Sequence, residues 1–397
     1  MILKRKKIMI KLLIQVLCFI LLSYRGVAQS SELLSELIEK AEQTNTEALI
    51  VYRNDELIVE NYFEIGHPDT LIETMSCTKS IVALAMMAML DDGLLDSLET
   101  PVYHFYPEWN QGMKKQITIF HLLSMTSGIQ NVPNASIEIY PSPDFVKLAL
   151  CAELSDPPGA KFSYNNKSLN LLAGIVHKLT GKRLDEYVES RLFRPLGIER
   201  YKWTLDEVGN PHVMAGCQLR PMDFAKIGLM VLNQGRHNGG QVITAPSITS
   251  MLEPTQLYQG YGLLWWISYE ETYYVVDNEV IEQLESMMVS EEFIQSIKSI
   301  KGTYKGFDVF EEQLQQEFGE DYSERIYAET KGEVQIRKKV FIGEPISYNA
   351  NGYLGNYLVI VPETRTVGVR MTSHRSYDWE SHISNSYTEF IDLIIGL

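Results

Sequence analysis

Several features that would assign a function at once are scarce or absent in this 397-residue sequence. No group of cysteine and histidine residues has zinc-site spacing, so we expect no metal and no cofactor. Of four cysteines, only Cys77, Cys151 and Cys217 lie outside the N-terminal segment, an odd and sparse set that predicts no disulfide framework. Internal repeats and low-complexity segments are also absent. The function must therefore be inferred from particular side chains and their spacing.

Positive charge is also scarce. The chain has 35 basic residues against 51 acidic ones, a formal net charge of −16. Six of the basic residues fall within the first 28 positions, so the remainder carries about −22. Such a balance argues against nucleic acid and anionic membrane surfaces as partners. We expect a small-molecule or short-peptide substrate instead.

The one long apolar run lies at the N-terminus. It covers residues 12–22, follows five basic residues, and is followed by the small residues Gly26-Val27-Ala28. This pattern predicts a signal peptide over residues 1–28, cleaved before Gln29, and hence a secreted or periplasmic protein. The run is short for a membrane span, so a retained N-terminal anchor is the alternative.

The order of predicted elements indicates an α+β fold. A helical stripe over residues 31–44 precedes a β-hairpin at 47–63, a long mainly helical region follows, and strands are expected at 346–361 and 364–372. We therefore predict an antiparallel sheet flanked by N- and C-terminal helices, built from about 29–75 and 345–397. A large helical domain, about 76–268, is inserted into it.

Residues 270–344 form a separate stretch with 18 acidic and 8 basic residues and Glu-rich amphipathic patterns. Two interpretations stand beside each other. The stretch rims a functional site and selects substrates, or it is a surface insertion without a part in the chemistry. Its tyrosines and amphipathic patterns favour a segment that packs against the body over a free tail.

The most informative pair is Ser76 and Lys79, because no other serine in the chain has a lysine three positions later. The residues that follow are strong helix formers, and positions i and i+3 share one face of a helix. The Lys79 amine would then lie beside the Ser76 hydroxyl, which needs a base to become a nucleophile. The helix N-terminus favours a developing oxyanion. A serine cap followed by an exposed lysine is the other interpretation.

A second candidate pair is Tyr164 and Asn166, in the run Tyr164-Asn165-Asn166. Tyr164 follows the turn-rich segment 156–160 and precedes a predicted helix over 169–179. A loop supported by a helix is a suitable place for a proton-transfer group. The alternative is a packing tyrosine that donates to a backbone carbonyl.

A third candidate is the run over residues 348–362, most of which falls in the predicted strand 346–361 and which contains Gly352 and Gly355. Glycine within a strand pattern indicates a close backbone approach, or a bulge. A substrate lying beside that strand would gain a backbone N–H for its oxyanion. The chain has no G-x-S-x-G motif, which disfavours an α/β-hydrolase triad.

Taken together, these motifs resemble the serine β-lactamase-like hydrolases: class C β-lactamases, D-alanyl-D-alanine carboxypeptidases and related esterases. The resemblance covers about 47–268 and 346–372. Supporting segments in matching order are Gly93–Leu98, Pro101-Val102, Pro107–Trp109, Thr118–Gly128, Asp223–Gly228 and Tyr261–Trp266.

The resemblance implies a role for each candidate. Ser76 is the acylated nucleophile, and Lys79 and Tyr164 share the proton transfers, with the identity of the acylation base left open. Asn166 binds the substrate near the scissile carbonyl. Asn351, Gly352 and Tyr353 border the substrate, and the backbone N–H groups of Ser76 and Tyr353 form the oxyanion hole.

One departure from the family bears on the substrate. The third motif usually begins with Lys or His, whereas the corresponding triplet here is Ala350-Asn351-Gly352. A methyl group cannot pair with a carboxylate, which penicillins and D-alanyl-D-alanine peptides both carry. An ester or amide without that carboxylate is therefore favoured. Arg370, His374 or Arg375, nearby in the sequence, would be the substitutes.

The leading hypothesis is a secreted serine hydrolase that acts through an acyl-enzyme on an ester or amide. A β-lactamase or D-alanyl-D-alanine carboxypeptidase, acting on penicillins or peptidoglycan peptides, is the first alternative. A non-catalytic binding protein that retains the fold is the second.

Overall fold

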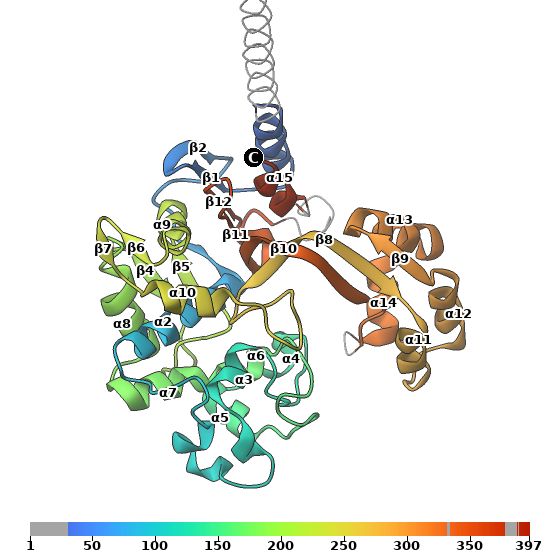
Figure 1. Cartoon of the computed structure of the whole chain (residues 1–397), viewed down its shortest axis with the longest axis horizontal. Helices are drawn as coiled ribbons and strands as arrows, with labels where there is room; N and C mark the ends of the chain where they lie inside the picture. The colour runs from blue at the N-terminus through green and yellow to red at the C-terminus, as the bar shows by residue number, and fades with distance from the viewer. Residues whose placement is uncertain (1–30, 332–333, 378–386, 388) are drawn as a thin grey trace, which may run out of the picture.

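The computed structural model describes residues 31–331, 334–377, 387 and 389–397, so the predicted signal peptide lies outside the described residues. Its centre is a seven-stranded antiparallel sheet in the order β2-β1-β12-β11-β10-β8-β9 (Figure 1). The strands are β1 Ala48–Arg53, β2 Glu56–Tyr62, β8 Trp266–Val276, β9 Gly302–Lys305, β10 Lys338–Gly352, β11 Asn356–Val361 and β12 Thr366–Met371. Strands from both chain ends meet in this sheet, which confirms the predicted α+β class.

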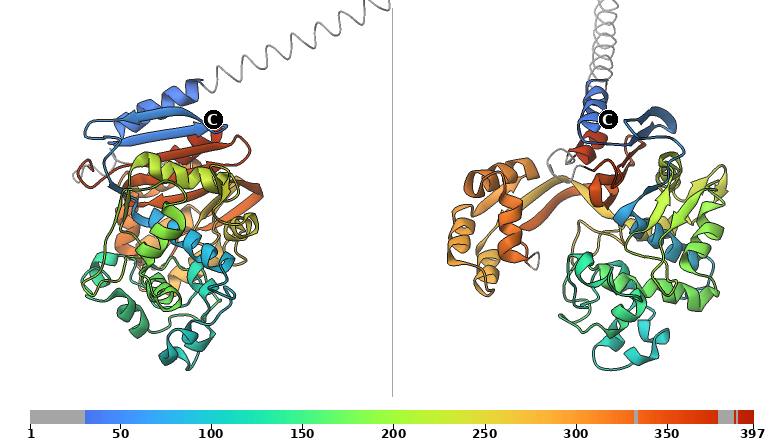
Figure 2. Two further views of the ribbon diagram at one scale, coloured as in Figure 1. Left: turned by 90° about the vertical axis from the view of Figure 1, so that its left-hand side faces the viewer. Right: turned by 180° about the vertical axis from the view of Figure 1, so that it is seen from behind.

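The two faces of the sheet are covered by different parts of the chain (Figure 2). On β1, Leu49 and Val51 pack with the helix over residues 31–43 and with α15 (Phe390–Gly396). The alternate residues Ala48 and Ile50 join the large core that the sheet shares with the helical part. This period of two is the alternation expected of a strand buried on both faces.

The helical part surrounds α2 (Thr78–Asp91), of which nearly every residue is buried, so this helix shows no polar face. Gly93 follows it at φ +66°, the left-handed geometry with which helices commonly end. The other helices of this part are α3 Ile119–Leu123, α4 Ala135–Glu138, α5 Phe145–Cys151, α6 Asn166–Leu169, α7 Leu171–Thr180, α8 Leu184–Val188, α9 Pro221–Leu232 and α10 Ala245–Leu252. The short strands are β3 Ile72–Glu73, β4 Tyr201–Trp203, β5 Cys217–Leu219, β6 Arg236–His237 and β7 Gly240–Gln241.

The acidic stretch folds around a core of its own. Strands β8 and β10 extend beyond the body as a two-stranded ribbon, and the stretch lies at its far end (Figure 1). The elements there are α11 Asn278–Glu285, α12 Glu291–Ser299, β9, α13 Phe307–Phe318 and α14 Tyr322–Thr330. Their buried side chains form a cluster separate from the main core, with Phe310 at its centre. It is therefore no free tail, but it packs chiefly on itself.

One strand prediction was wrong in detail. The structure divides residues 346–361 into the end of β10 and the whole of β11, joined by a tight turn at Tyr353–Gly355. Leu354 and Gly355 have φ of +66° and +75°, the left-handed geometry that reverses the chain there. The apolar period on either side hides this turn in the sequence.

Candidate active site

Ser76 and Lys79 lie together, as their spacing predicts. Ser76 is in the 3₁₀ turn Met75–Cys77, which leads directly into α2 (Thr78–Asp91). The Lys79 side chain is almost fully buried, and its Nζ donates to Ser76 Oγ at 2.9 Å and to the Met214 carbonyl at 2.7 Å. The amine is thus held against the hydroxyl, which excludes the alternative of a solvent-exposed lysine.

The backbone at Ser76 is held under strain. The preceding residue, Met75, has φ +51°, a left-handed conformation that costs free energy in a non-glycine residue. Neighbouring threonines fix the turn: Thr74 Oγ1 lies 3.0 Å from Thr78 Oγ1 and donates to the Cys217 carbonyl at 3.1 Å. Strain held by its surroundings is a common property of functional sites.

Tyr164 reaches the same place from the helical part. Lys79 Nζ lies 5.0 Å from the centre of its ring, and Trp266 stacks on that ring at 5.8 Å. The Tyr164 carbonyl accepts from Asn131 Nδ2, and Asn165 caps α6 through the Ser168 N–H. The loop and helix predicted from the sequence therefore do place this phenol beside the Ser76–Lys79 pair.

Gly352 explains how the third segment comes near the nucleophile. A Cβ on Gly352 would lie 2.5 Å from the Thr74 carbonyl oxygen and 3.1 Å from Met75 Cβ. Only glycine lets β10 approach the turn that carries Ser76, so the predicted close approach is confirmed. The pairing between β10 and β8 ends at Asn349–Trp266. Residues 350–352 of β10 therefore have no partner residue in β8.

The two predicted binding amides share an unusual feature. Asn166 Oδ1 and Asn351 Oδ1 are buried and have no hydrogen-bond partner among the described residues. A buried acceptor without a partner is costly, and for Asn166 this favours the predicted role of accepting from a substrate. Asn351 lies opposite Tyr357 of β11, and Tyr357 stacks on Phe390 of α15. The side chain of Asn351 therefore leaves the sheet on the face covered by α15, opposite the face on which Gly352 approaches the Ser76 turn. Its role stays a prediction.

The structure removes one proposed substitute for the missing lysine. Ala350 is buried in the core. Arg370 is fully buried too, and burial lowers its pKa to about 10. Its Nη1 donates to the Gly355 carbonyl at 2.6 Å and its Nη2 to the Thr44 carbonyl at 2.5 Å. Arg370 therefore holds the turn after Gly352 and cannot read a substrate carboxylate, so that expectation was wrong.

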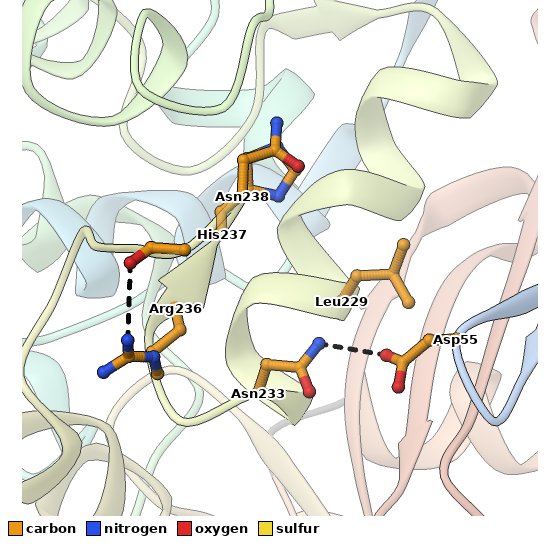
Figure 3. A pocket seen from close by; sticks show the side chains of 7 residues that line it. Asp55, Leu229, Asn233, Arg236, His237 and Asn238 are labelled. Atoms are coloured by element: carbon orange, nitrogen blue, oxygen red, sulfur yellow. Dashed lines mark hydrogen bonds between the residues drawn. The ribbon is translucent and has the colours of Figure 1, made fainter.

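One hollow elsewhere on the surface is separate from the predicted site. A surface hollow lies between the β1–β2 turn and the end of α9, lined by Asp55, Asn233 and Arg236 among others, and shares no residue with the predicted site (Figure 3). Within the described residues there is no group of three or more potential metal ligands. No helix in the described part of the chain has the length and apolarity needed to cross a bilayer.

An antiparallel sheet carrying a helical domain, with the Ser76–Lys79 pair at the start of its buried helix, is the architecture of a serine hydrolase of the β-lactamase/transpeptidase type. The Beta-lactamase family model matches residues 34–387. The chain therefore belongs to the beta-lactamase family, whose members named among its relatives include an esterase, an amide hydrolase and penicillin-binding proteins.

Individual relatives are distant. The 6-aminohexanoate-dimer hydrolase of Paenarthrobacter ureafaciens is 25% identical over 55% of this chain, and the esterase EstB of Burkholderia gladioli is 29% identical over 38%. These matches span 60% and 43% of the relatives' own lengths. The solved class C beta-lactamase of Rhodobacter sphaeroides covers 92% of this chain and 98% of its own, at 16% identity and a TM-score of 0.54. This likeness shows the fold.

Proposed function

We propose that this protein is a secreted enzyme that hydrolyses an ester or amide through an acyl-enzyme on Ser76. The observation that carries the proposal is the placement of Lys79 Nζ, 2.9 Å from Ser76 Oγ and 5.0 Å from the ring of Tyr164. A nucleophile held against a base that is itself held by a third group is the arrangement that covalent catalysis requires.

In this mechanism the Lys79–Tyr164 pair takes the proton from Ser76 Oγ as the oxygen attacks the substrate carbonyl. The backbone N–H groups of Ser76 and Tyr353 receive the developing oxyanion, and Asn166 binds beside the carbonyl. The pair then returns the proton to the leaving alcohol or amine. Water, activated by the same pair, attacks the ester on Ser76 and releases the acid.

The substrate class is inferred from residue 350. Ala350 is buried and offers no cation where the family's third motif begins, and Arg370 is occupied by backbone carbonyls, whereas His374 and Arg375 stay predicted substitutes. The names of the esterase and the 6-aminohexanoate-dimer hydrolase are in keeping with ester or amide cleavage. The predicted signal peptide supports a secreted or periplasmic location.

The test compares p-nitrophenyl acetate with nitrocefin and locates the acyl group. We expect ester hydrolysis, weak nitrocefin turnover, and a fluorophosphonate adduct on the peptide that contains Ser76. Efficient nitrocefin cleavage would favour the penicillin-recognising alternative. Neither labelling nor hydrolysis would indicate a binding protein. N-terminal sequencing of the exported protein should begin at Gln29.

A further inference from the structure

A carboxylate that the proposed reaction does not use lies close to the nucleophile in the sequence. Glu73 ends β3, three positions before Ser76. Its Oε1 accepts from the Gly216 N–H at 3.0 Å, and within the described residues it forms no ion pair with a lysine or arginine. Burial raises the pKa of Glu73, while the Gly216 N–H and the charge of His374 act in the opposite direction. Keeping a partly buried carboxylate in this setting is unfavourable unless it has a partner.

Two backbone segments place Glu73 at the side of the active site. The loop Met214–Gly216 accepts from Lys79 Nζ through its first carbonyl and donates to Glu73 through its last N–H. On the other side, Gly352 of β10 approaches the Thr74 carbonyl, directly after Glu73. The carboxylate therefore lies between the loop that holds the general base and the strand that borders the substrate.

Two exposed tyrosines belong to segments that adjoin this position. Tyr353, directly after Gly352, is 56% exposed, and its ring lies 6.5 Å from that of His374. Tyr140 is 49% exposed and directly follows Ile139, which packs in one cluster with Met214 and Ala215 of the loop that donates to Glu73. Large exposed rings beside a site offer the electron-rich faces that attract cations.

We propose that Glu73, with the rings of Tyr140 and Tyr353, forms a subsite for a cationic ammonium group of the substrate. The inference rests on the proposed hydrolase function and assigns its substrate class. A cation would neutralise Glu73 and interact with the tyrosine faces. Ala350 supplies no cation for a substrate carboxylate, whereas the charge of His374 acts on Glu73 and would compete with a bound ammonium group.

Glu73 could instead have only a structural role, in which its hydrogen bond to Gly216 stabilises the Met214–Gly216 loop. The two roles predict different effects of removing its charge. Glu73→Gln keeps an amide oxygen that can accept from Gly216 and removes only the charge. If the role is only structural, the substitution leaves the preference between cationic and neutral substrates unchanged. If it binds a cation, that preference falls while turnover of neutral esters stays the same.

The experiment uses two pairs of esters that differ only in charge. Acetylcholine is compared with 3,3-dimethylbutyl acetate for a cation on the alcohol side. The p-nitrophenyl esters of 4-(trimethylammonio)butanoate and 5,5-dimethylhexanoate test the acyl side. We expect at least one pair to show a preference for the cation of about tenfold in kcat/KM, removed by Glu73→Gln with the neutral ester within about twofold. The exposed Glu207 supplies the matched control, Glu207→Gln, which should leave the ratio unchanged.

A binding measurement separates this inference from the function on which it rests. Phenyltrimethylammonium is titrated into the Ser76→Ala protein by calorimetry, where no hydrolysis is needed. Binding that weakens about tenfold when Glu73→Gln is added supports the subsite even if no test ester is cleaved. No binding, or binding indifferent to Glu73→Gln, together with unchanged ester ratios, overturns the proposal whether or not Ser76 is catalytic.

Discussion

The body of the protein and the stretch over residues 270–344 are built differently. In the body, strands and helices from distant parts of the sequence share one large core, and the predicted catalytic side chains lie at its edge. The acidic stretch has a separate core around Phe310, and its charges are partly neutralised by pairs such as Lys298–Glu285 at 2.7 Å. The difference favours our proposal that the chemistry belongs to the body, and it shows that the stretch packs chiefly on itself.

The two regions meet through a line of aromatic rings. Phe341 of β10 contacts Tyr258 of the body at 5.5 Å, and Tyr258 stacks on Phe162 at 4.6 Å, two positions before Tyr164. Between Phe341 and Ser347 the pairing of β8 with β10 is interrupted by bulges around Pro345. The addition is therefore joined to the site by a few rings, which allows it to affect substrate range without contributing to the reaction.

The largest expected effect is that of Ser76→Ala. Removal of the nucleophile should lower ester turnover on the order of 10³-fold or more and abolish fluorophosphonate labelling, with the circular dichroism spectrum unchanged. Ser323→Ala, an exposed serine of the acidic stretch, is the control and should retain full turnover. Hydrolysis near the wild-type rate by the Ser76→Ala protein would move the chemistry away from this part of the body.

The next effect is a coupled loss at Lys79 and Tyr164. Lys79→Ala and Tyr164→Phe should each lower kcat by roughly 10²–10⁴-fold, since both disable one proton path. The double variant should be little worse than the poorer single variant. Steady-state kinetics of all four proteins decides the matter. Two losses that multiply would show that the residues act independently.

Two buried phenylalanines test whether the regions are separate units. Phe224→Ala in the body and Phe310→Ala in the acidic stretch remove equally buried rings, each at a cost of about 3–5 kcal/mol. We expect Phe224→Ala to lower the temperature at which ester turnover is lost. Phe310→Ala should leave it unchanged and accelerate hydrogen exchange only in the acidic stretch. A common loss of turnover would show that the two cores unfold together.

Much of the body was predictable because its signals are local. The hairpin at 47–63, the helix after Ser76 and its end near Gly93 follow from apolar period and turn residues, and the structure confirms them. The Ser76–Lys79 contact followed from helical spacing alone. The approach of Gly352 to the Ser76 turn could be anticipated because a glycine within a strand pattern marks a place where another backbone comes close.

The features that could not be predicted depend on contacts between residues that are far apart in the sequence. Arg370 appeared to be a candidate for substrate binding, yet it is buried by carbonyls at positions 44, 354 and 355 that no pattern links to it. The Met214 carbonyl that holds Lys79 has no side-chain signature. The independence of the acidic stretch also escaped, because an amphipathic helix looks the same whether it packs on a body or on its own neighbours.

A smaller effect is expected when the acidic stretch is removed. β8 and β10 pair through Val275 and Lys338, so residues 277–336 can be replaced by Asn-Gly, a hairpin turn between Val276 and Arg337. Turnover of p-nitrophenyl acetate should stay within about twofold. Loss of a net charge of −10 should raise the relative rate on an anionic hemisuccinate ester about threefold at low salt, and not at 0.5 M salt. If the preference does not move, the stretch is a surface addition only.

The smallest expected effect is a difference in Tm between variants of two glutamates, Glu73 of the body and Glu285 of the acidic stretch. Burial raises the folded-state pKa of Glu73, so its ionised form opposes folding above that pKa, and the penalty disappears as the pH falls through it. Glu73→Gln should therefore raise Tm at pH 7 on the order of 1 °C, and give no gain near pH 4. Glu285 instead has Lys298 at 2.7 Å in an exposed pair, so Glu285→Gln should lower Tm slightly or leave it unchanged. If Glu285→Gln raised Tm as much as Glu73→Gln, the destabilisation would come from the overall negative charge of the protein and not from the partly buried position of Glu73.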